Sequence, residues 1–592
     1  MTERHSPEEN NLQQLITEHI DLWTGAVKAK SSAGRGSSGK RELYGIKKLR
    51  ELILELAVRG KLVAQDPNDE PASVLLERIV AEKAELVKQG KIKKTKTLPK
   101  ISEEEKPFEL PEGWEFGRLG NIGESNIGLT YSPKDISDSG IPVLRSSNIQ
   151  NNKIDLGDLV RVNLEIKDSA QIFDGDLLIC ARNGSKALVG KTARFYDIGE
   201  KTAFGAFMAV FRSQVNSYIE VFLNSPVFRR FLDGVSTTTI NQITQSNLIA
   251  TIAPIPPLAE QHRIVAKVDE LMALCDQLEQ QTESSLDAHQ TLVQTLLDTL
   301  LQSANAEELE QNWQRLSAHF DLLFTTEQSI DQLKQTILQL AVMGKLVPQD
   351  PNDEPASELL KRIAAEKEEL VKQKKIKKQK PLPPISDNEK PFQLPKGWEW
   401  CRADDICYGI TSGSTPPKTE FSDGEGIPYL KVYNIRNQKI DFEYQPQFVN
   451  ESYHMTKLAR SILKPGDVVM NIVGPPLGKI AIIPSTYDEW NCNQAIVFFR
   501  TIDSRLRFYI YQYLVAGVFL NSIELIGTAG QDNISVTKSR SIVIPMPPLP
   551  EQNHIVAKVD QLMALCDQLK AKLADSKTTQ LNLADALVAQ AM

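Results

Sequence analysis

Two stretches of the chain carry the hydrophobic spacing of a long helix. In each, apolar side chains recur in alternating steps of four and three, at Ile264, Val268, Leu271, Cys275 and Leu278, and at Ile555, Val559, Leu562, Cys566 and Leu569. This alternation is typical of a coiled-coil seam. No proline interrupts residues 258–303, so the first stretch predicts one helix of about 44 residues and roughly 65 Å. An ordinary core helix is the alternative, although such helices are usually shorter.

Two blocks, residues 116–250 and 400–540, contain short apolar runs that predict strands. Residues 176–182 read DLLICAR and residues 467–474 read DVVMNIVG, and turn residues such as glycine, proline and asparagine separate the runs. Each block is followed by a proline pair, Pro256-Pro257 or Pro547-Pro548, which a helix interior does not tolerate. The pattern predicts two α/β or α+β domains of about 150 residues, each followed by a long helix.

The chain contains an internal repeat. Residues 56–73 return at 340–357 with 16 of 18 positions identical, and residues 255–278 return at 546–569 with 19 of 24 identical. The two strand-rich blocks, in contrast, have diverged almost beyond alignment, apart from islands such as Gly175-Asp176 and Gly466-Asp467. A duplication fixes the architecture before any element is assigned. We therefore expect a pseudo-twofold arrangement in which one shared scaffold holds two different recognition domains.

The repeat and the proline pairs divide the chain into five segments. Residues 1–107 form an N-terminal helical region with a Gly/Ser linker at 31–40 and a lysine-rich spacer, and residues 108–258 form the first variable domain. Residues 259–391 form a central helical region with a second lysine-rich spacer, residues 392–549 the second variable domain, and residues 550–592 a C-terminal helix.

Composition narrows the class of protein. The chain has 592 residues and a formal net charge of −8, the opposite of the basic balance expected of a protein that holds nucleic acid alone. It lacks an apolar run of about 18 residues that could span a membrane. The N-terminus lacks the apolar segment of a secretory signal, and the six cysteines form no CxxC pair. We expect a cytoplasmic protein without disulfides and without a membrane partner.

Catalytic and cofactor motifs are weak or missing. Residues 34–40 match GxxxxGK but are followed by Arg41 instead of serine or threonine, so the magnesium-binding hydroxyl is absent. The sequence has no HExxH, no zinc-spaced Cys/His cluster and no GxSxG. The paired acids Asp404 and Asp405 are expected to be solvated at a surface turn. These patterns favour a binding or scaffolding protein with no catalytic residues, metal or cofactor of its own over an enzyme.

Two lysine tracts precede the variable domains. They comprise Lys88, Lys91, Lys93, Lys94, Lys96 and Lys100, and Lys372, Lys374, Lys375, Lys377, Lys378 and Lys380. Such tracts are either solvated surfaces or contacts to phosphates, each of which releases counterions when neutralised. Neither interpretation provides sequence specificity.

Side chains able to pair with base edges cluster in the predicted loops. Arginine and lysine suit guanine, and asparagine and glutamine suit adenine. The candidates are Arg145, Ser147, Asn148, Arg182, Asn183, Lys186, Thr238, Asn241 and Gln242 in the first domain, and Lys431, Tyr433, Asn434, Asn471, Lys479, Gln531 and Asn533 in the second. Each is a weak signal alone, because most polar loop residues are simply solvated, but the set occupies matched positions.

These features together resemble a known family. Each variable domain begins with a Leu-Pro-x-Gly-Trp sequence, at 110–114 and 394–398, and ends in Pro-Pro-Leu-x-Glu-Gln, at 256–261 and 547–552, before a long helix. The chain is similar in this respect, over nearly its whole length, to the specificity subunits of type I restriction-modification systems.

The resemblance implies a division of labour. The variable domains would be target-recognition domains, each reading one half of an asymmetric bipartite site in double-stranded DNA. The repeated helices would pack antiparallel as a coiled coil, set the spacing, and bind two methyltransferase subunits and then the restriction and translocation subunits. S-adenosylmethionine, ATP and magnesium would be bound by those partners.

Two other classes of function remain open from the sequence. One is an interaction scaffold whose variable domains bind proteins or glycans. The other is a self-contained nuclease or methyltransferase, which the missing cofactor motifs disfavour.

Overall fold

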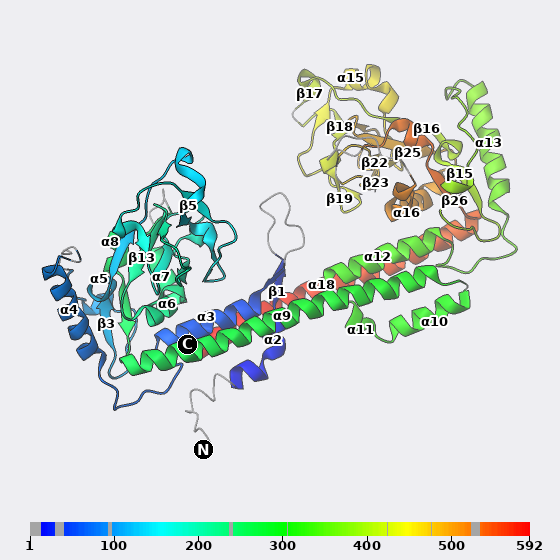
Figure 1. Ribbon diagram of the computed structural model, residues 1–592. Helices are drawn as coiled ribbons and strands as arrows, with labels where there is room; N and C mark the ends of the chain where they lie inside the picture. Colours follow the sequence, from blue (N-terminus) through cyan, green and yellow to red (C-terminus); the bar gives the residue numbers. More distant parts are fainter. Residues whose placement is uncertain are drawn as a thin grey trace. The chain divides into compact units, whose positions relative to one another are not determined.

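The structure is a computed structural model, and it forms two compact units. It describes residues 14–29, 41–90, 92, 98–235, 241–304, 306–422, 424–474, 476–522 and 533–592. One unit comprises Met1–Leu286 with Asp575–Met592, and the other comprises Asp287–Ala574. Helices α9 (Leu258–Gln302) and α18 (Leu549–Ala591) have 45 and 43 residues, and each contributes to both units. Both begin directly after their proline pair, so the predicted long helices are confirmed (Figure 1).

In the first unit, α3 (Tyr44–Val58) lies against α9 and the end of α18 (Figure 1). The Arg50 guanidinium bonds Glu279 of α9 at 2.7 Å, whereas Gln65, beyond the end of α3, reaches Glu260 at the start of α9. Residue numbers therefore rise along α3 as they fall along α9, and these two helices are antiparallel. The Tyr44 hydroxyl donates to Asp585 of α18 at 2.8 Å, and the Lys61 ammonium donates to the carbonyl at the end of α18. Helix α18 therefore runs antiparallel to α9.

In the second unit, α12 (Glu327–Val342) takes the place of α3. Its Lys334 pairs with Asp567, and its Asp331 lies 2.6 Å from Lys570, so α12 is antiparallel to α18. The Lys345 ammonium donates to the Leu301 carbonyl at 2.7 Å, beside the end of α9. The long helices are thus antiparallel here too. The sequence predicted helical regions here and a coiled coil of the long helices, but it did not predict that α3 and α12 pack against them as the third helix of each bundle.

The first variable domain is built from small sheets. One four-stranded sheet has the order β11-β10-β13-β4, another has the order β8-β5-β12-β9, and β14 pairs with β3. Their bounds are β3 (Glu115–Arg118), β4 (Glu124–Ile127), β5 (Ile136–Leu144), β8 (Val160–Val162), β9 (Gln171–Ile172), β10 (Leu177–Cys180), β11 (Thr192–Arg194), β12 (Thr202–Phe204), β13 (Met208–Arg212) and β14 (Ile252–Ile255). Only β5 and β12 pair in parallel among these strands. The strand-rich prediction holds, and the apolar run 176–182 contains the fully buried strand β10.

The second variable domain repeats this plan. Its sheets have the orders β16-β25-β22-β23 and β17-β21-β18-β24, and β15 pairs with β26. Their bounds are β15 (Glu399–Arg402), β16 (Cys407–Ser412), β17 (Phe421–Ser422), β18 (Ile427–Leu430), β21 (Phe448–Val449), β22 (Val468–Asn471), β23 (Ile480–Ile482), β24 (Asn491–Cys492), β25 (Ile496–Thr501) and β26 (Val543–Met546). The buried strand β22 corresponds to β10, and the parallel pair β18 and β24 corresponds to β5 and β12.

Short helices and hairpins complete both units. The first unit has β1 (Val27–Ala29) and β2 (Arg41–Leu43), the hairpin β6 (Ile149–Gln150) and β7 (Lys153–Ile154), and helices α2 (Ile20–Gly25), α4 (Ala72–Lys88), α5 (Leu119–Ile122), α6 (Asn216–Asn224), α7 (Pro226–Val235) and α8 (Gln245–Ala250). The second has the hairpin β19 (Ile435–Arg436) and β20 (Lys439–Ile440), and helices α10 (Ala306–Ser317), α11 (Phe320–Leu323), α13 (Ala356–Lys372), α14 (Ala403–Ile406), α15 (Glu451–Thr456), α16 (Arg507–Ala516) and α17 (Val536–Arg540). The predicted linker at 31–40 lies outside the described residues.

A buried hydrogen bond joins the start of each variable domain to the start of the long helix that follows it. The Trp114 indole N–H donates to Glu260 at the start of α9 at 3.0 Å, and the Trp398 indole donates to Glu551 at the start of α18 at 2.9 Å. Both carboxylates are almost fully buried. Burial raises the pKa of the Glu260 carboxyl above its usual value, and the bond from Trp114 opposes that rise. The two sequence signatures, Leu-Pro-x-Gly-Trp and Pro-Pro-Leu-x-Glu-Gln, are therefore the two halves of one contact.

A buried arginine reinforces this connection between each variable domain and its long helix. Arg118, at the end of β3, donates to the carbonyls of Pro99 and Ala250 and pairs with Glu105 at 2.8 Å. Arg402 makes the matching bonds to Pro383, Ser541 and Glu389. Because the guanidinium links the entering spacer, the first strand and the end of the domain, each variable domain is fixed to its own long helix on a repeated framework.

Candidate nucleic-acid interface

Three loop stretches that the sequence separates come together in the first domain. The Asn183 amide donates to the Ser146 hydroxyl at 3.2 Å, and the Asn241 side chain donates to the Gly184 carbonyl at 3.1 Å. Arg182 and Gln242 form an isolated β-bridge. Thr244 caps α8 by accepting from the Asn247 backbone, which fixes the position of the last loop. The candidates Arg182, Asn183, Asn241 and Gln242 thus form one surface, which we call the reading surface of the first domain.

The loop between β12 and β13 also belongs to this surface. The Phe207 carbonyl accepts hydrogen bonds from the backbone N–H groups of Ala181 and Arg182, at 2.9 and 3.0 Å. The Phe207 ring is 60% exposed and lies under the Arg182 guanidinium, 5.3 Å from the ring centroid. Sequence reasoning missed Phe207 because a lone phenylalanine beside a predicted strand is usually a core residue. Its place in a turn between two strands was the signal that could have identified it.

The second domain has the same loop framework with different side chains. Val473 and Asn533 form the bridge that corresponds to Arg182 and Gln242, and Ser535 caps α17 as Thr244 caps α8. The loop between β24 and β25 carries Asn493 and Gln494, two polar residues that sequence reasoning also missed. Gln494 is exposed and accepts from Thr415 at 2.7 Å. The two reading surfaces therefore share this bridge and this helix cap and differ in their side chains.

Three predicted base contacts have a structural role instead. Asn148 and Asn434 are fully buried, and each accepts from the backbone N–H three residues earlier while donating to two carbonyls of the following loop. Asn471 is 1% exposed and links Lys479 to Pro476 through its amide. A buried side chain whose bonds are satisfied inside the protein is not available to a base edge. We therefore remove Asn148, Asn434 and Asn471 from the set of base contacts.

The remaining described candidates reach solvent to different degrees. Ser147 and Lys186 are exposed, and Lys186 pairs with Asp233 at 2.9 Å. Arg145 is partly exposed and pairs with Asp158 at 2.8 Å, a surface ion pair of the kind that contributes little stability and is easily exchanged.

In the second domain, Lys431 lies over the Phe421 ring, 5.4 Å from its centroid, and Lys479 is half-buried. The Tyr433 hydroxyl donates weakly to the Gln445 carbonyl at 3.4 Å. These side chains remain predicted contacts.

Several predictions fall on residues outside the described part of the chain. They are Thr238, Gln531, the Walker-like string at 34–40, and Lys91, Lys93, Lys94 and Lys96 of the first lysine tract. The second tract is described from Lys372 to Lys380, and its six lysines are exposed, whereas Ile376 between them packs against the core of the second unit. This tract therefore lies on the surface with its charges directed to solvent.

The seam residues are occupied within the chain itself. Ile264, Val268, Leu271 and Leu278 are buried in the first unit, Ile555 and Val559 are buried in the second, and Leu562 and Leu569 are partly buried there. Burial places these side chains in the packing between helices of the chain itself, as a coiled-coil seam predicts, and leaves them little surface for a partner subunit. Cys275 and Cys566 are buried as expected, and burial raises the pKa of the Cys275 thiol to about 11.

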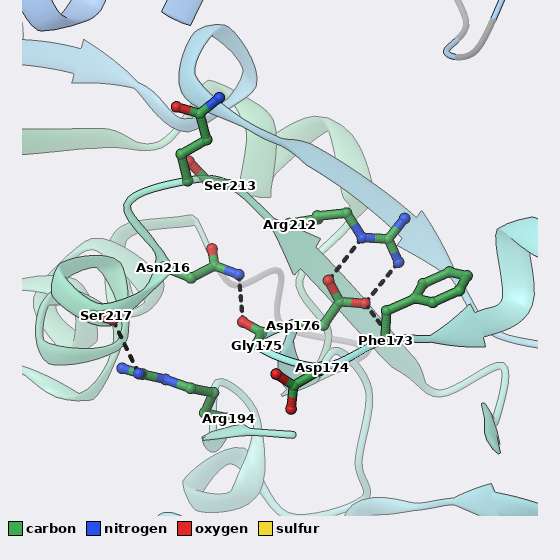
Figure 2. Close-up of a pocket in the computed structure, with 10 residues that line it drawn as sticks. Phe173, Asp174, Gly175, Asp176, Arg194, Arg212, Ser213, Asn216 and Ser217 are labelled. Atoms are coloured by element: carbon green, nitrogen blue, oxygen red, sulfur yellow. Dashed lines mark hydrogen bonds and ion pairs between the residues drawn. The ribbon is translucent and has the colours of Figure 1, made fainter. Parts of the chain in front are cut away.

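A hollow of about 400 Å³ lies beside β13 and α6 of the first domain, and Figure 2 shows the side chains that line it. Within it, Arg212 donates twice to the buried Asp176 carboxylate, at 2.7 and 2.6 Å, and Asn216 donates to the Gly175 carbonyl. Arg500 and Asp467 make the same pair in the second domain, at 2.8 and 2.6 Å. Because the pair recurs where the domains otherwise differ, we assign it to the shared framework. It also explains the surviving Gly-Asp islands of the sequence.

The structure corrects one expectation about acidic residues. Asp404 is not solvated: it accepts from the Arg540 guanidinium at 2.9 Å and lies 3.6 Å from the Lys367 ammonium. Asp405 is exposed, as expected, and accepts from the Arg402 backbone N–H. Among the residues that the structure describes, no group of three or more His, Cys, Asp and Glu side chains could hold a metal ion. Within the same residues, no helix is both long and apolar enough to cross a membrane.

Comparison with known proteins decides the family. The family model described as type I restriction modification DNA specificity domain matches twice, at residues 111–288 and 395–576. The chain belongs to the family of type I restriction-modification specificity subunits. The matched segments begin at each Leu-Pro-x-Gly-Trp sequence and continue into α9 and α18, so they include both reading surfaces.

Relatives of this specificity subunit match along its whole length. It is 45% identical over 591 residues to the type I restriction enzyme EcoAI specificity subunit of Escherichia coli, covering 98% of this chain and 99% of the relative. It is 46% identical over 603 residues to the Escherichia coli EcoEI specificity subunit, covering 98% and 100%. A chain from a solved type I restriction-modification structure is 19% identical, with a TM-score of 0.48 and coverage of 82% and 99%. Neither the family model nor the two Escherichia coli relatives favours a scaffold unrelated to DNA.

Proposed function

We propose that each variable domain of this specificity subunit reads one half of an asymmetric bipartite site in double-stranded DNA. The observation that supports this most directly is the pairing of identical frameworks with different reading surfaces. The Trp114–Glu260 and Trp398–Glu551 bonds repeat, whereas Arg182 is replaced by Val473 at the matching bridge. Because different side chains read different base edges, two such domains specify two different half-sites.

The helices are proposed to set the spacing between the half-sites and to bind two methyltransferase subunits, followed by restriction subunits, in the cytoplasm. Leu274 of α9 and Leu565 of α18 occupy equivalent repeat positions and are 37% and 49% exposed. Such outward leucines are suited to contact with a partner protein. The subunit itself is proposed to be non-catalytic, with S-adenosylmethionine, ATP and magnesium bound by its partners.

Charge predicts how DNA affinity is divided. The first variable domain has 14 basic and 16 acidic residues, and the second has 15 of each. Near-neutral domains gain little from phosphates, so the partners must supply most of the phosphate contacts. Alone, the chain is expected to bind duplex DNA weakly, with a Kd of roughly 10⁻⁶–10⁻⁴ M. This Kd should rise further as the salt concentration is raised.

Binding measurements on labelled duplex DNA, with and without the methyltransferase subunits, test this proposal. We expect tight, sequence-dependent retention only in the complex. If the complex is not retained on any duplex, a non-DNA scaffold is the better account. Tight, salt-insensitive binding by the chain alone would contradict the charge argument.

A further inference from the structure

The reading surface of the first domain presents an arginine, Arg182, for which the described part of the chain provides no charged partner. Among the described residues, the Arg182 side chain has no ion pair or hydrogen bond, and its guanidinium lies over the Phe207 ring. Other arginines of this domain are paired: Arg161 with Glu200 at 2.7 Å, and Arg194 with Glu220 at 2.6 Å. An exposed, unpaired guanidinium beside an exposed aromatic ring is typical of a binding contact.

The local backbone holds this pair in position. Because Phe207 accepts from the backbone of Arg182 itself, the two side chains leave the surface from adjacent, hydrogen-bonded positions. Ile127, Ala181, Gln242 and Gln245 line a hollow of about 350 Å³ beside them. The ring restricts the arginine side chain, so less conformational entropy is lost when the guanidinium forms two hydrogen bonds at once.

The second domain identifies the position as variable. The Ile472 backbone donates to the Ala495 carbonyl at 2.8 Å, as Ala181 donates to Phe207. The Ile534 backbone donates to the Ile472 carbonyl at 2.9 Å, as Ile243 donates to Ala181. These matched bonds align Arg182 with Val473 and Phe207 with Ala495. An arginine on a phenylalanine in one copy is thus replaced by a valine, 43% exposed, in the other.

We propose that Arg182, supported by Phe207, reads a guanine in the half-site of the first domain. The guanidinium fork matches the O6 and N7 acceptors of guanine in the major groove, the most common specific contact of arginine with DNA. Val473 has no polar side-chain group, so the second domain makes no such contact at the matching position. The inference rests on the proposed function, because it needs the first domain to face base edges.

Methylome sequencing of a host that carries the complete system tests the inference with three variants. The Arg182→Ala variant should no longer require guanine at one position of the first half-site. Discrimination between guanine and the other bases at that position should fall about 10- to 100-fold. Arg182→Lys should retain part of the preference, and Phe207→Ala should weaken it. The second half-site should not change in any of them.

Arg161→Ala is the matched control, because Arg161 lies on β8 and is already paired with Glu200. We expect its methylation motif to equal that of the unchanged chain. An unchanged motif in Arg182→Ala overturns the inference. So does a uniform loss of methylation with every position still specified, since that marks a phosphate contact. If the unchanged chain directs no motif at all, the proposed function fails first, and the inference fails with it.

Discussion

Exchange of residues 119–250 for the matching segment of another family member is expected to change one half of the recognised DNA site and to leave the other half unchanged. The segment begins directly after Arg118 and ends before β14, so the paired strands β3 and β14 and the Trp114–Glu260 bond remain in place. The second domain has its own sheets and its own Trp398–Glu551 bond. The readout is the methylated motif of a host carrying the exchanged chain.

One contact across the exchange boundary guides the choice of donor. Arg230 of α7 pairs with Glu55 of α3, which is only 2% exposed. A donor without this arginine would leave a buried carboxylate with fewer partners, which is costly. With such a donor, Glu55→Gln should be introduced together with the exchange to remove the buried charge, because the second copy has Gln339 at the equivalent position. A correctly folded exchange that changed both half-sites, or neither, would show that the domains do not read DNA independently.

Removal of the indole N–H of Trp114 or Trp398 is expected to destabilise the unit that contains it. In Trp398→Phe, the aromatic ring is retained, but the buried Glu551 carboxylate loses the donor that lies 2.9 Å away. Loss of one partner of a buried polar group costs about 1–3 kcal/mol, which corresponds to a fall in Tm of roughly 2–10 °C for a unit of this size. Trp398→Ala removes the ring as well and should cost about 3–5 kcal/mol. Differential scanning calorimetry of the full chain measures both.

Two variants serve as comparisons for this effect. Trp400→Phe should change the Tm less, because the contact of Trp400 with the Phe392 ring, 5.2 Å between centroids, can persist in phenylalanine. Trp114→Phe should act on the first unit as Trp398→Phe acts on the second. Equal, small falls in Tm for Trp398→Phe and Trp400→Phe would show that the hydrogen bond to Glu551 does not stabilise the second unit.

The parts of the fold that repeat in the sequence could be predicted from it. The heptad-like spacing after each proline pair located α9 and α18 to within one or two residues, because a continuous apolar stripe without proline has few other solutions. The bond between Trp114 and Glu260 could not be predicted, since it joins residues 146 positions apart. Helices α3 and α12 also carry apolar residues in steps of three and four, at Ile46, Leu49, Ile53 and Leu56 and at Ile330, Leu333, Ile337 and Leu340, but this spacing does not say which helices they pack against, so the third helix of each bundle was not assigned.

The reading surfaces were predicted in part. The sequence identified Arg182, Asn183, Asn241 and Gln242, which the structure brings together. It also selected Asn148 and Asn434, because an asparagine in a loop can either contact a base or hydrogen-bond its own backbone, and composition does not separate the two. Burial separates them: both asparagines are fully enclosed. The choice between a core phenylalanine and an exposed one at Phe207 likewise depends on tertiary packing, which periodicity does not encode.

The methylated bases of a host genome, sequenced with and without this chain in the presence of its partner subunits, test the central claim most directly. Two domains with one framework and two different reading surfaces predict a single motif of two unlike halves separated by an unread spacer, methylated only when the chain is present. A palindromic or uninterrupted motif, or methylation that does not depend on the chain, would contradict this account.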